Sequence, residues 1–299
     1  MKSQTYLKYL PSLAFITIFF SIILLNMILD FSNKQNITSI ISLILVSSIG
    51  IYHGAFDIKK GTRISKHLNS KLSIFSFLYV VFSLTIILLW FAVPTFLLSL
   101  FLLISILHFG SEDYQYFNSN SNYLAYFLKG VLIIILPLIF HFNDTVSIFK
   151  TLNLFTDETP FLVLKSNYVL LILLTMINFI FSLLSVPNFC NKILINIDML
   201  LIILLNYFFD PIFAFTIYFC FLHSLRNIYK TEKYELISYK IFLTSFITFV
   251  SLIIVFSILY TYFDIIESFS YTIFIGLASL TFPHIATDII YNNLNLDNK

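Results

Sequence analysis

Charged residues are scarce in this sequence. Lysine and arginine number 17 and aspartate and glutamate number 15, so only 11% of the 299 residues are charged, whereas 59% are hydrophobic. A water-soluble domain carries about a quarter charged residues, and a fold of this size with so few charges could not cover its surface in water. The composition therefore excludes an ordinary soluble protein and predicts that lipid surrounds most of the chain.

Several other features are absent, and each absence excludes a class of function. The net charge is only +2 and no basic stripe occurs, which argues against binding of nucleic acid. The two cysteines, Cys190 and Cys220, form no metal-type pair. No Gly-x-Ser-x-Gly motif of a serine hydrolase is present. The six histidines are too few, and include no paired boxes, for a membrane diiron enzyme.

Long apolar runs dominate what remains. A helix needs about 20 apolar residues to cross a membrane, and polar punctuation divides the chain into about ten such runs, with eight as the lower bound. The junctions at Trp90–Pro94 and Asp210–Pro211 leave two divisions open, and Pro211 marks either a helix start or a kink. The expected spans are 10–29, 37–56, 72–91, 93–110, 123–141, 166–186, 192–208, 211–229, 241–262 and 270–291.

The distribution of lysine and arginine predicts the orientation of these spans. With ten spans, 13 of the 17 cations fall on the side of the N-terminus and three on the other, and cytoplasmic loops collect such residues. We therefore expect an all-α, polytopic bundle in the plasma (inner) membrane, with both termini cytoplasmic. We also expect residues 1–299 to form one domain. The run 10–29 is expected to be a retained helix and not a removed signal peptide, and residues 143–167 are expected to form an outer loop.

Four histidines lie inside the expected spans, where ionisable residues indicate function. These are His53, His108, His223 and His284, and each falls 12 to 16 residues after its span begins. That separation corresponds to roughly 18 to 24 Å along a helix. All four spans run from outside to inside, so the four rings share one depth, in the cytoplasmic half of the membrane.

Each of these histidines has a polar residue four positions later, on the same helix face. Three of the partners are carboxylates. A single histidine near a membrane boundary is more often an interfacial side chain, but the shared depth and repeated partners favour a metal site, in which carboxylates orient the imidazoles. Imidazoles without thiolates favour Fe, Zn or Cu. The partners are Asp57, Glu112, Asn227 and Asp288.

Four short strings carry a family resemblance: HGAFD at 53–57, HFGSED at 108–113, FCFLHSLR at 219–226 and PH at 283–284. In this order and spacing they resemble the Brp/Blh family, the integral membrane beta-carotene 15,15'-dioxygenases, over roughly residues 40–290. The resemblance implies cleavage of beta-carotene, or a related carotenoid, by O2 at the central double bond. Two molecules of retinal would result, commonly to supply a microbial rhodopsin.

The resemblance also implies a non-haem Fe(2+) held by four histidines. His53, His108 and His223 match three of them and are the catalytic and metal-binding candidates, whereas Asn227 stands at the fourth position. Asn227 could ligate through its carbonyl oxygen, leave a position open for O2, or be replaced by His284. The carboxylates expected to orient the imidazoles are Asp57, Glu112, Asp113 and Asp288.

Two alternatives of other classes remain open at this point. The substitution at Asn227 is compatible with a non-catalytic carotenoid- or retinal-binding relative. The intramembrane histidines and carboxylates are compatible with a metal or proton transporter, although the outer halves of their spans are almost wholly apolar. Arg226, at the cytoplasmic edge of its span, is interpreted as a positive-inside anchor.

Overall fold

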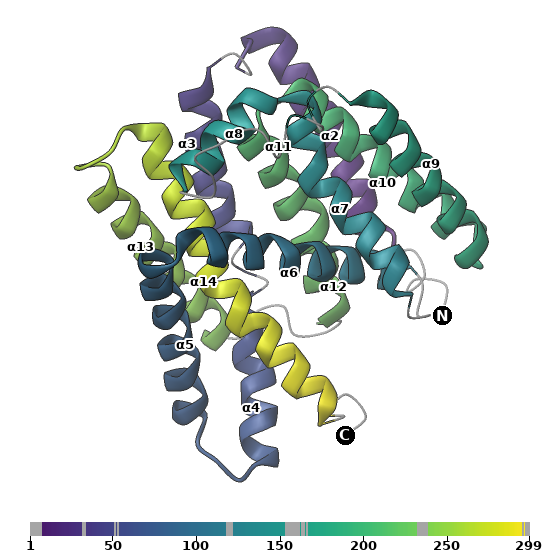
Figure 1. Cartoon of the computed structure of the whole chain (residues 1–299). Helices are drawn as coiled ribbons and strands as arrows, with labels where there is room; N and C mark the ends of the chain where they lie inside the picture. Colours follow the sequence, from purple (N-terminus) through teal and green to yellow (C-terminus); the bar gives the residue numbers. More distant parts are fainter. Residues whose placement is uncertain are drawn as a thin grey trace.

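The computed structural model describes residues 8–31, 34–50, 52, 54–117, 122–152, 162, 165, 167–231, 239–294 and 296, and these contain helices but no strand. Two π-helical segments and one 3-10 segment interrupt the α-helices. Figure 1 shows how the α-helices are arranged. The elements are α2 (Leu10–Leu29), α3 (Gln35–Leu45), η1 (Val46–Gly50), η2 (Gly54–Phe56), α4 (Asp57–His67), α5 (Leu72–Ala92), α6 (Pro94–Gln115), α7 (Tyr123–Phe140), α8 (Phe142–Thr151), α9 (Tyr168–Ser185), α10 (Phe189–Phe208), α11 (Pro211–Tyr218), η4 (Phe219–Ser224), α12 (Leu225–Thr231), α13 (Tyr239–Leu259) and α14 (Ile265–Asn293).

Nine helices within the described ranges are long and apolar enough to cross a membrane. The expected class, a polytopic bundle of membrane-spanning helices, is therefore confirmed. One difference from the expected ten spans concerns 211–229. That segment is helical, but it consists of three consecutive parts, α11, η4 and α12, and is not among the nine candidates.

Proline and polar caps set the helix boundaries that the sequence left open. Val93 separates α5 from α6, which begins at Pro94, so the junction divides two helices. The side chain of Asp210 accepts a hydrogen bond from the backbone N–H of Phe213, and Pro211 occupies the first turn of α11. A capped N-terminus with proline just inside it is a helix start. Pro211 therefore begins a helix and is not a kink.

The two π-helical segments pack against each other. A Cβ added to Gly50 of η1 would lie 2.6 Å from the ring of Phe219 in η4, so these two segments are in van der Waals contact. The expected span over 37–56 falls within the candidate span Gln35–His67, in which α3 is followed by η1, η2 and α4. π-helical turns occur frequently at functional sites, and η4 contains His223.

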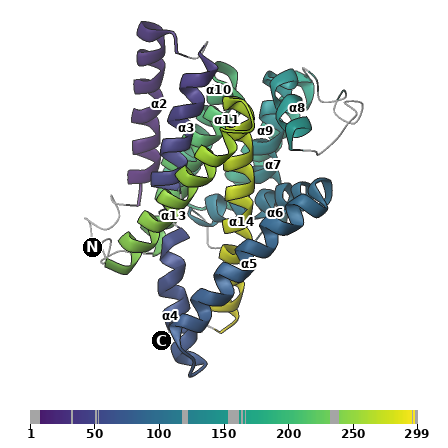
Figure 2. The same cartoon turned by 90° about the vertical axis from the view of Figure 1, so that its left-hand side faces the viewer.

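Two expected loops are helical. The helix α8 occupies the first part of the expected outer loop 143–167. Between the second and third expected spans, four of the five cations lie on α4, whose C-terminal turn contains Lys66 and His67. The helix α4 extends with the neighbouring ends of α5 and α14 at one end of the molecule (Figures 1 and 2).

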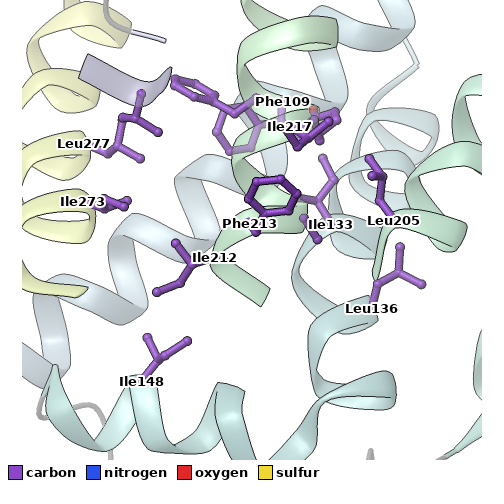
Figure 3. Packing of buried hydrophobic residues seen from close by; sticks show 14 of the residues in the cluster. Phe109, Ile133, Leu136, Ile148, Leu205, Ile212, Phe213, Ile217, Ile273 and Leu277 are labelled. Carbon is purple, nitrogen blue, oxygen red and sulfur yellow. The ribbon is translucent and has the colours of Figure 1, made fainter. Parts of the chain in front are cut away.

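The apolar core lies between α6, α7, α10, α11 and α14. Figure 3 shows Phe213 and Ile217 of α11 between Ile133 of α7 and Leu277 of α14. In the span of α7, 61% of residues are buried, compared with 6% in those of α5 and α13. The helix α7 is therefore central, whereas α5 and α13 present apolar side chains to lipid, which needs no polar coat.

Candidate metal centre

Side chains from α4, α6, η4 and α14 converge on one buried cluster. His108 and Glu112 lie one turn apart on α6, and His284 and Asp288 lie one turn apart on α14. Residues four apart share a helix face, so each helix presents one imidazole and one carboxylate. The π-helical segment η4 adds His223, and the first residue of α4 is Asp57.

The first group in the cluster consists of His108, Glu112 and His223. Each offers one ligand atom, and the three atoms lie within 4.8 Å of one another. The Nε2 atom of His223 is 3.6 Å from Oε2 of Glu112, and the imidazole ring centroids of His108 and His223 are 5.4 Å apart. Two imidazoles and one carboxylate form a donor set that suits non-haem Fe(II) in oxygenases.

A second carboxylate lies on the other side of the His223 ring. Its Nδ1 atom is 3.8 Å from Oδ1 of Asp113, and the hydroxyl of Tyr218 donates a 2.7 Å hydrogen bond to Oδ2 of the same carboxylate. Phe109 packs edge-on against the imidazole at 4.6 Å between centroids. These contacts orient His223 so that Nε2 faces Glu112 and Nδ1 faces Asp113.

The second group consists of Asp57, His284 and Asp288, whose candidate ligand atoms also lie within 4.8 Å of one another. Nδ1 of His284 is 2.9 Å from both carboxylate oxygens of Asp57. Tyr79 of α5 donates a 2.9 Å hydrogen bond to Oδ2 of Asp57, and Lys60 forms an ion pair with Asp288. Both carboxylates of this group are thus engaged by a hydrogen-bond donor or a cation.

The two groups adjoin at His108. Its ring centroid is 5.4 Å from that of His284, with the rings nearly perpendicular at 86°. One cluster therefore contains the three described histidines of the four that the sequence singled out. His53 lies outside the described residues.

Three carboxylates of this cluster contact a histidine of another element: Asp57 contacts His284, and Glu112 and Asp113 contact His223. Asp57 contacts His284, which is 227 residues away in the sequence, whereas Nε2 of His284 is 3.9 Å from its own neighbour Asp288. Asn227 donates a 2.8 Å hydrogen bond from Nδ2 to Oε2 of Glu112. Spacing along one helix placed these residues on the correct faces, but packing between helices determines their partners.

Arg226 is buried, which contradicts its interpretation as an anchor at the membrane edge. Only 2% of the residue is exposed. Its Nη1 atom lies 3.3 Å from Oδ1 of Asp113, and Nη2 forms an ion pair with Asp198 of α10. Nη2 also donates a 3.0 Å hydrogen bond to Oγ of Ser12 in α2. The guanidinium therefore connects α2 and α10 to the carboxylate that faces His223.

Sequence reasoning missed Lys60, Tyr79, Tyr218 and Asp198. A signal existed for Asp198, because a carboxylate inside an apolar run calls for a partner. The chain contains 18 tyrosines, and nothing in the sequence distinguishes Tyr79 or Tyr218 from the others. Their hydroxyls gain a role only where α5 and α11 pack against the cluster.

Comparison with known proteins shows which family shares these motifs. The chain matches the family described as beta-carotene 15,15'-dioxygenase over residues 44–289. The chain belongs to the beta-carotene 15,15'-dioxygenase family. A similar protein named beta-carotene 15,15'-dioxygenase, from the uncultured marine bacterium 66A03, is 30% identical over 266 residues, which cover 84% of this chain and 93% of the relative. No solved structure matches the chain.

The match to the beta-carotene 15,15'-dioxygenase family includes every residue of the cluster, from Asp57 to Asp288. The resemblance inferred from the four motifs is thereby confirmed. Membership of the family and the name of the relative support a dioxygenase, and the apolar helices support an integral membrane protein.

Proposed function

We propose that this protein cleaves beta-carotene, or a closely related carotenoid, with O2 at the central 15,15' double bond to give two molecules of retinal. The observation that carries the proposal is the convergence of His108, His223 and Glu112 inside a chain of the dioxygenase family. Cleavage replaces one carbon–carbon double bond by two carbonyl groups, so one O2 accounts for the oxygen of both aldehydes. Retinal released into the membrane would be available to a microbial rhodopsin.

The proposed cofactor is Fe(2+), held by His53, His108 and His223. Of the two groups in the cluster, the one with His108 and His223 fits the metal better, because it supplies two imidazoles. In the other group, Lys60 neutralises Asp288 and Tyr79 donates to Asp57, so a cation would have to compete with these partners. Bound iron would supply the activation of O2 that a singlet polyene cannot achieve alone.

The residues around the iron ligands act by orientation and by exclusion of water. Asp113 holds Nδ1 of His223, and Asp57 holds Nδ1 of His284, which leaves Nε2 of each ring directed away from these carboxylates. A carboxylate beside the second ring nitrogen favours one tautomer and one direction of a metal-ligating histidine. The rings of Phe109 and Phe219 pack on His223 and keep water from one side of it.

The turns of α14 that precede His284 lie in apolar surroundings. Leu277 and Leu280 of α14 lie together with Leu43 of α3, Val46 of η1 and Leu252 of α13. Leu277 and Leu280 are about two turns and one turn before His284 on the same helix face. The Leu280 carbonyl also accepts a 3.4 Å hydrogen bond from Tyr79. The cluster therefore has an apolar flank that suits a carotenoid, and with the proposed orientation of the spans the metal site lies in the cytoplasmic half of the plasma membrane.

Expression in bacteria that produce beta-carotene tests the proposal. The wild-type protein is expected to bleach the cells and yield retinal, and His108→Ala, which removes an imidazole from the cluster, is expected to abolish both. Comparable amounts of folded protein in the membrane are required for the comparison. Persistent orange colour with a folded, iron-loaded wild-type protein would contradict cleavage, and bound but intact carotenoid would indicate a carrier.

A further inference from the structure

Asn227 stands where the family pattern has a fourth histidine, and its contacts show what it does there. The residue lies on α12, one turn after His223, and only 7% of it is exposed. Its amide nitrogen donates a 2.8 Å hydrogen bond to Oε2 of Glu112. An amide binds a metal through its oxygen. The amide nitrogen of Asn227, which faces this carboxylate, is therefore not an atom that would bind the metal.

Glu112 is placed as a ligand would be. Its Oε2 atom is 3.6 Å from Nε2 of His223, beyond the length of a hydrogen bond. Two ligands of one ion at 2.0–2.2 Å lie about 3 to 3.5 Å apart when their bonds to the ion meet at between a right angle and the tetrahedral angle. The separation is therefore close to that of two ligands of a shared ion.

The neighbouring carboxylate strengthens this interpretation. Asp113 faces Nδ1 of His223 and accepts a hydrogen bond from Tyr218. A carboxylate beside Nδ1 favours the tautomer that carries its proton there, which turns the lone pair of Nε2 toward Glu112. A cation between that lone pair and the carboxylate of Glu112 would be attracted by both groups. Successive residues of α6 thus have different roles, Asp113 in orientation and Glu112 in ligation.

We infer that Glu112 supplies a carboxylate ligand in place of the fourth imidazole of the family pattern, and that Asn227 is the residue that positions it. The inference rests on the proposed iron site and specifies which residues of this chain bind and position the iron ligands. A carboxylate adds negative charge to the metal, which stabilises Fe(III) relative to Fe(II) compared with an all-imidazole set. The site then resembles the mixed imidazole and carboxylate sites of non-haem oxygenases.

Iron affinity, measured anaerobically on the purified full chain in detergent, tests this assignment without reference to cleavage. We expect Glu112→Gln to lose more than 100-fold in affinity for Fe(2+), because a ligand is removed. Asn227→Ala is expected to lose about 10- to 100-fold, the usual effect of removing a partner that orients a ligand. Asn227→His, which offers an imidazole at the family position, is expected to bind iron and to raise the Fe(III)/Fe(II) potential.

Matched substitutions away from the cluster serve as controls. Glu267→Gln makes the same carboxylate-to-amide change in the first turn of α14, 17 residues before His284 and so about 25 Å along the helix. Asn196→Ala removes an amide that donates to Ser182 and to the backbone of α10. Both are expected to retain wild-type iron affinity and potential.

Three results would overturn the assignment. One is wild-type iron affinity in Glu112→Gln, as expected if Glu112 only pairs with a protonated His223. Another is a larger loss in Asn227→Ala than in Glu112→Gln, which would make Asn227 the ligand. The third result is obtained with the wild-type protein alone. It is the absence of any change in the carboxylate stretching bands between infrared spectra recorded with and without iron.

The outcome separates this inference from the proposed function. The expected order of iron affinities without any formation of retinal would support Glu112 as a ligand and refute carotenoid cleavage. Formation of retinal by a protein whose Glu112→Gln variant binds iron normally would refute the ligand assignment alone.

Discussion

At the scale of single residues, the guanidinium of Arg226 lies between two buried carboxylates. Asp113 and Asp198 are both 0% exposed, and Arg226 itself is almost completely buried. The rings of Tyr116 and Phe117 lie 5.4 and 4.9 Å from the guanidinium carbon and cover it further. Buried charges are tolerated only where partners compensate them, so this arrangement makes Arg226 a structural requirement for the carboxylate that orients His223.

Replacement of Arg226 by Met is expected to lower the free energy of unfolding by about 3 to 5 kcal/mol, because Asp113 and Asp198 would be left without their cation. Detergent-induced unfolding followed by circular dichroism measures the change. Lys66→Met, at an exposed position on α4, is the control and is expected to change stability by less than about 0.5 kcal/mol. A shift no larger than that of the control would show that the ion pairs contribute nothing.

At the scale of elements, α6 and α7 approach each other closely at two glycines. A Cβ added to Gly110 would lie 1.9 Å from the carbonyl oxygen of Tyr126, and one added to Gly130 would lie 1.8 Å from that of Ile106. Small residues allow this backbone contact between membrane helices. Because Gly110 follows His108 by two residues and precedes Glu112 by two, the helix contact fixes the height at which α6 presents both side chains.

Gly110→Ala is expected to force α6 away from α7 and to destabilise the protein by about 1 to 3 kcal/mol or more, the cost of overpacking. The thermal unfolding midpoint should fall, and iron affinity should fall with it because His108 and Glu112 move together. Gly54→Ala is the matched control, since an added Cβ there meets nothing within 4 Å. Equal midpoints for the two variants would refute a packing role for Gly110.

At the scale of the whole molecule, the distribution of cations predicts which side of the membrane each helix end faces. With alternating spans, we expect the start of α10 to lie on the cytoplasmic side together with Lys192. Cys190 is exposed at this position and Cys220 is buried in η4. These two cysteines are the whole complement of the chain, so they report orientation without any engineered site.

A membrane-impermeant maleimide is expected to label Cys190 in inverted membrane vesicles but not in intact cells. Cys220 is expected to react only after denaturation, because burial denies access to the reagent. Cys190→Ser should remove the labelling of native protein and thereby identify the site. Labelling of Cys190 from outside the intact cell would contradict the expected orientation of the spans.

The sequence by itself determined the solvent of this protein and the spacing of its functional side chains along each helix. Runs of about 20 apolar residues can be stable only across a lipid layer, and a shared depth for His108, His223 and His284 follows from counting along the runs. Only the tertiary structure decided which groups meet, because contacts between helices depend on their packing and on the interruptions at η1 and η4. Asp57 therefore contacts His284, and Asn227 donates a hydrogen bond to Glu112. Spacing along one helix specifies neither of these pairings.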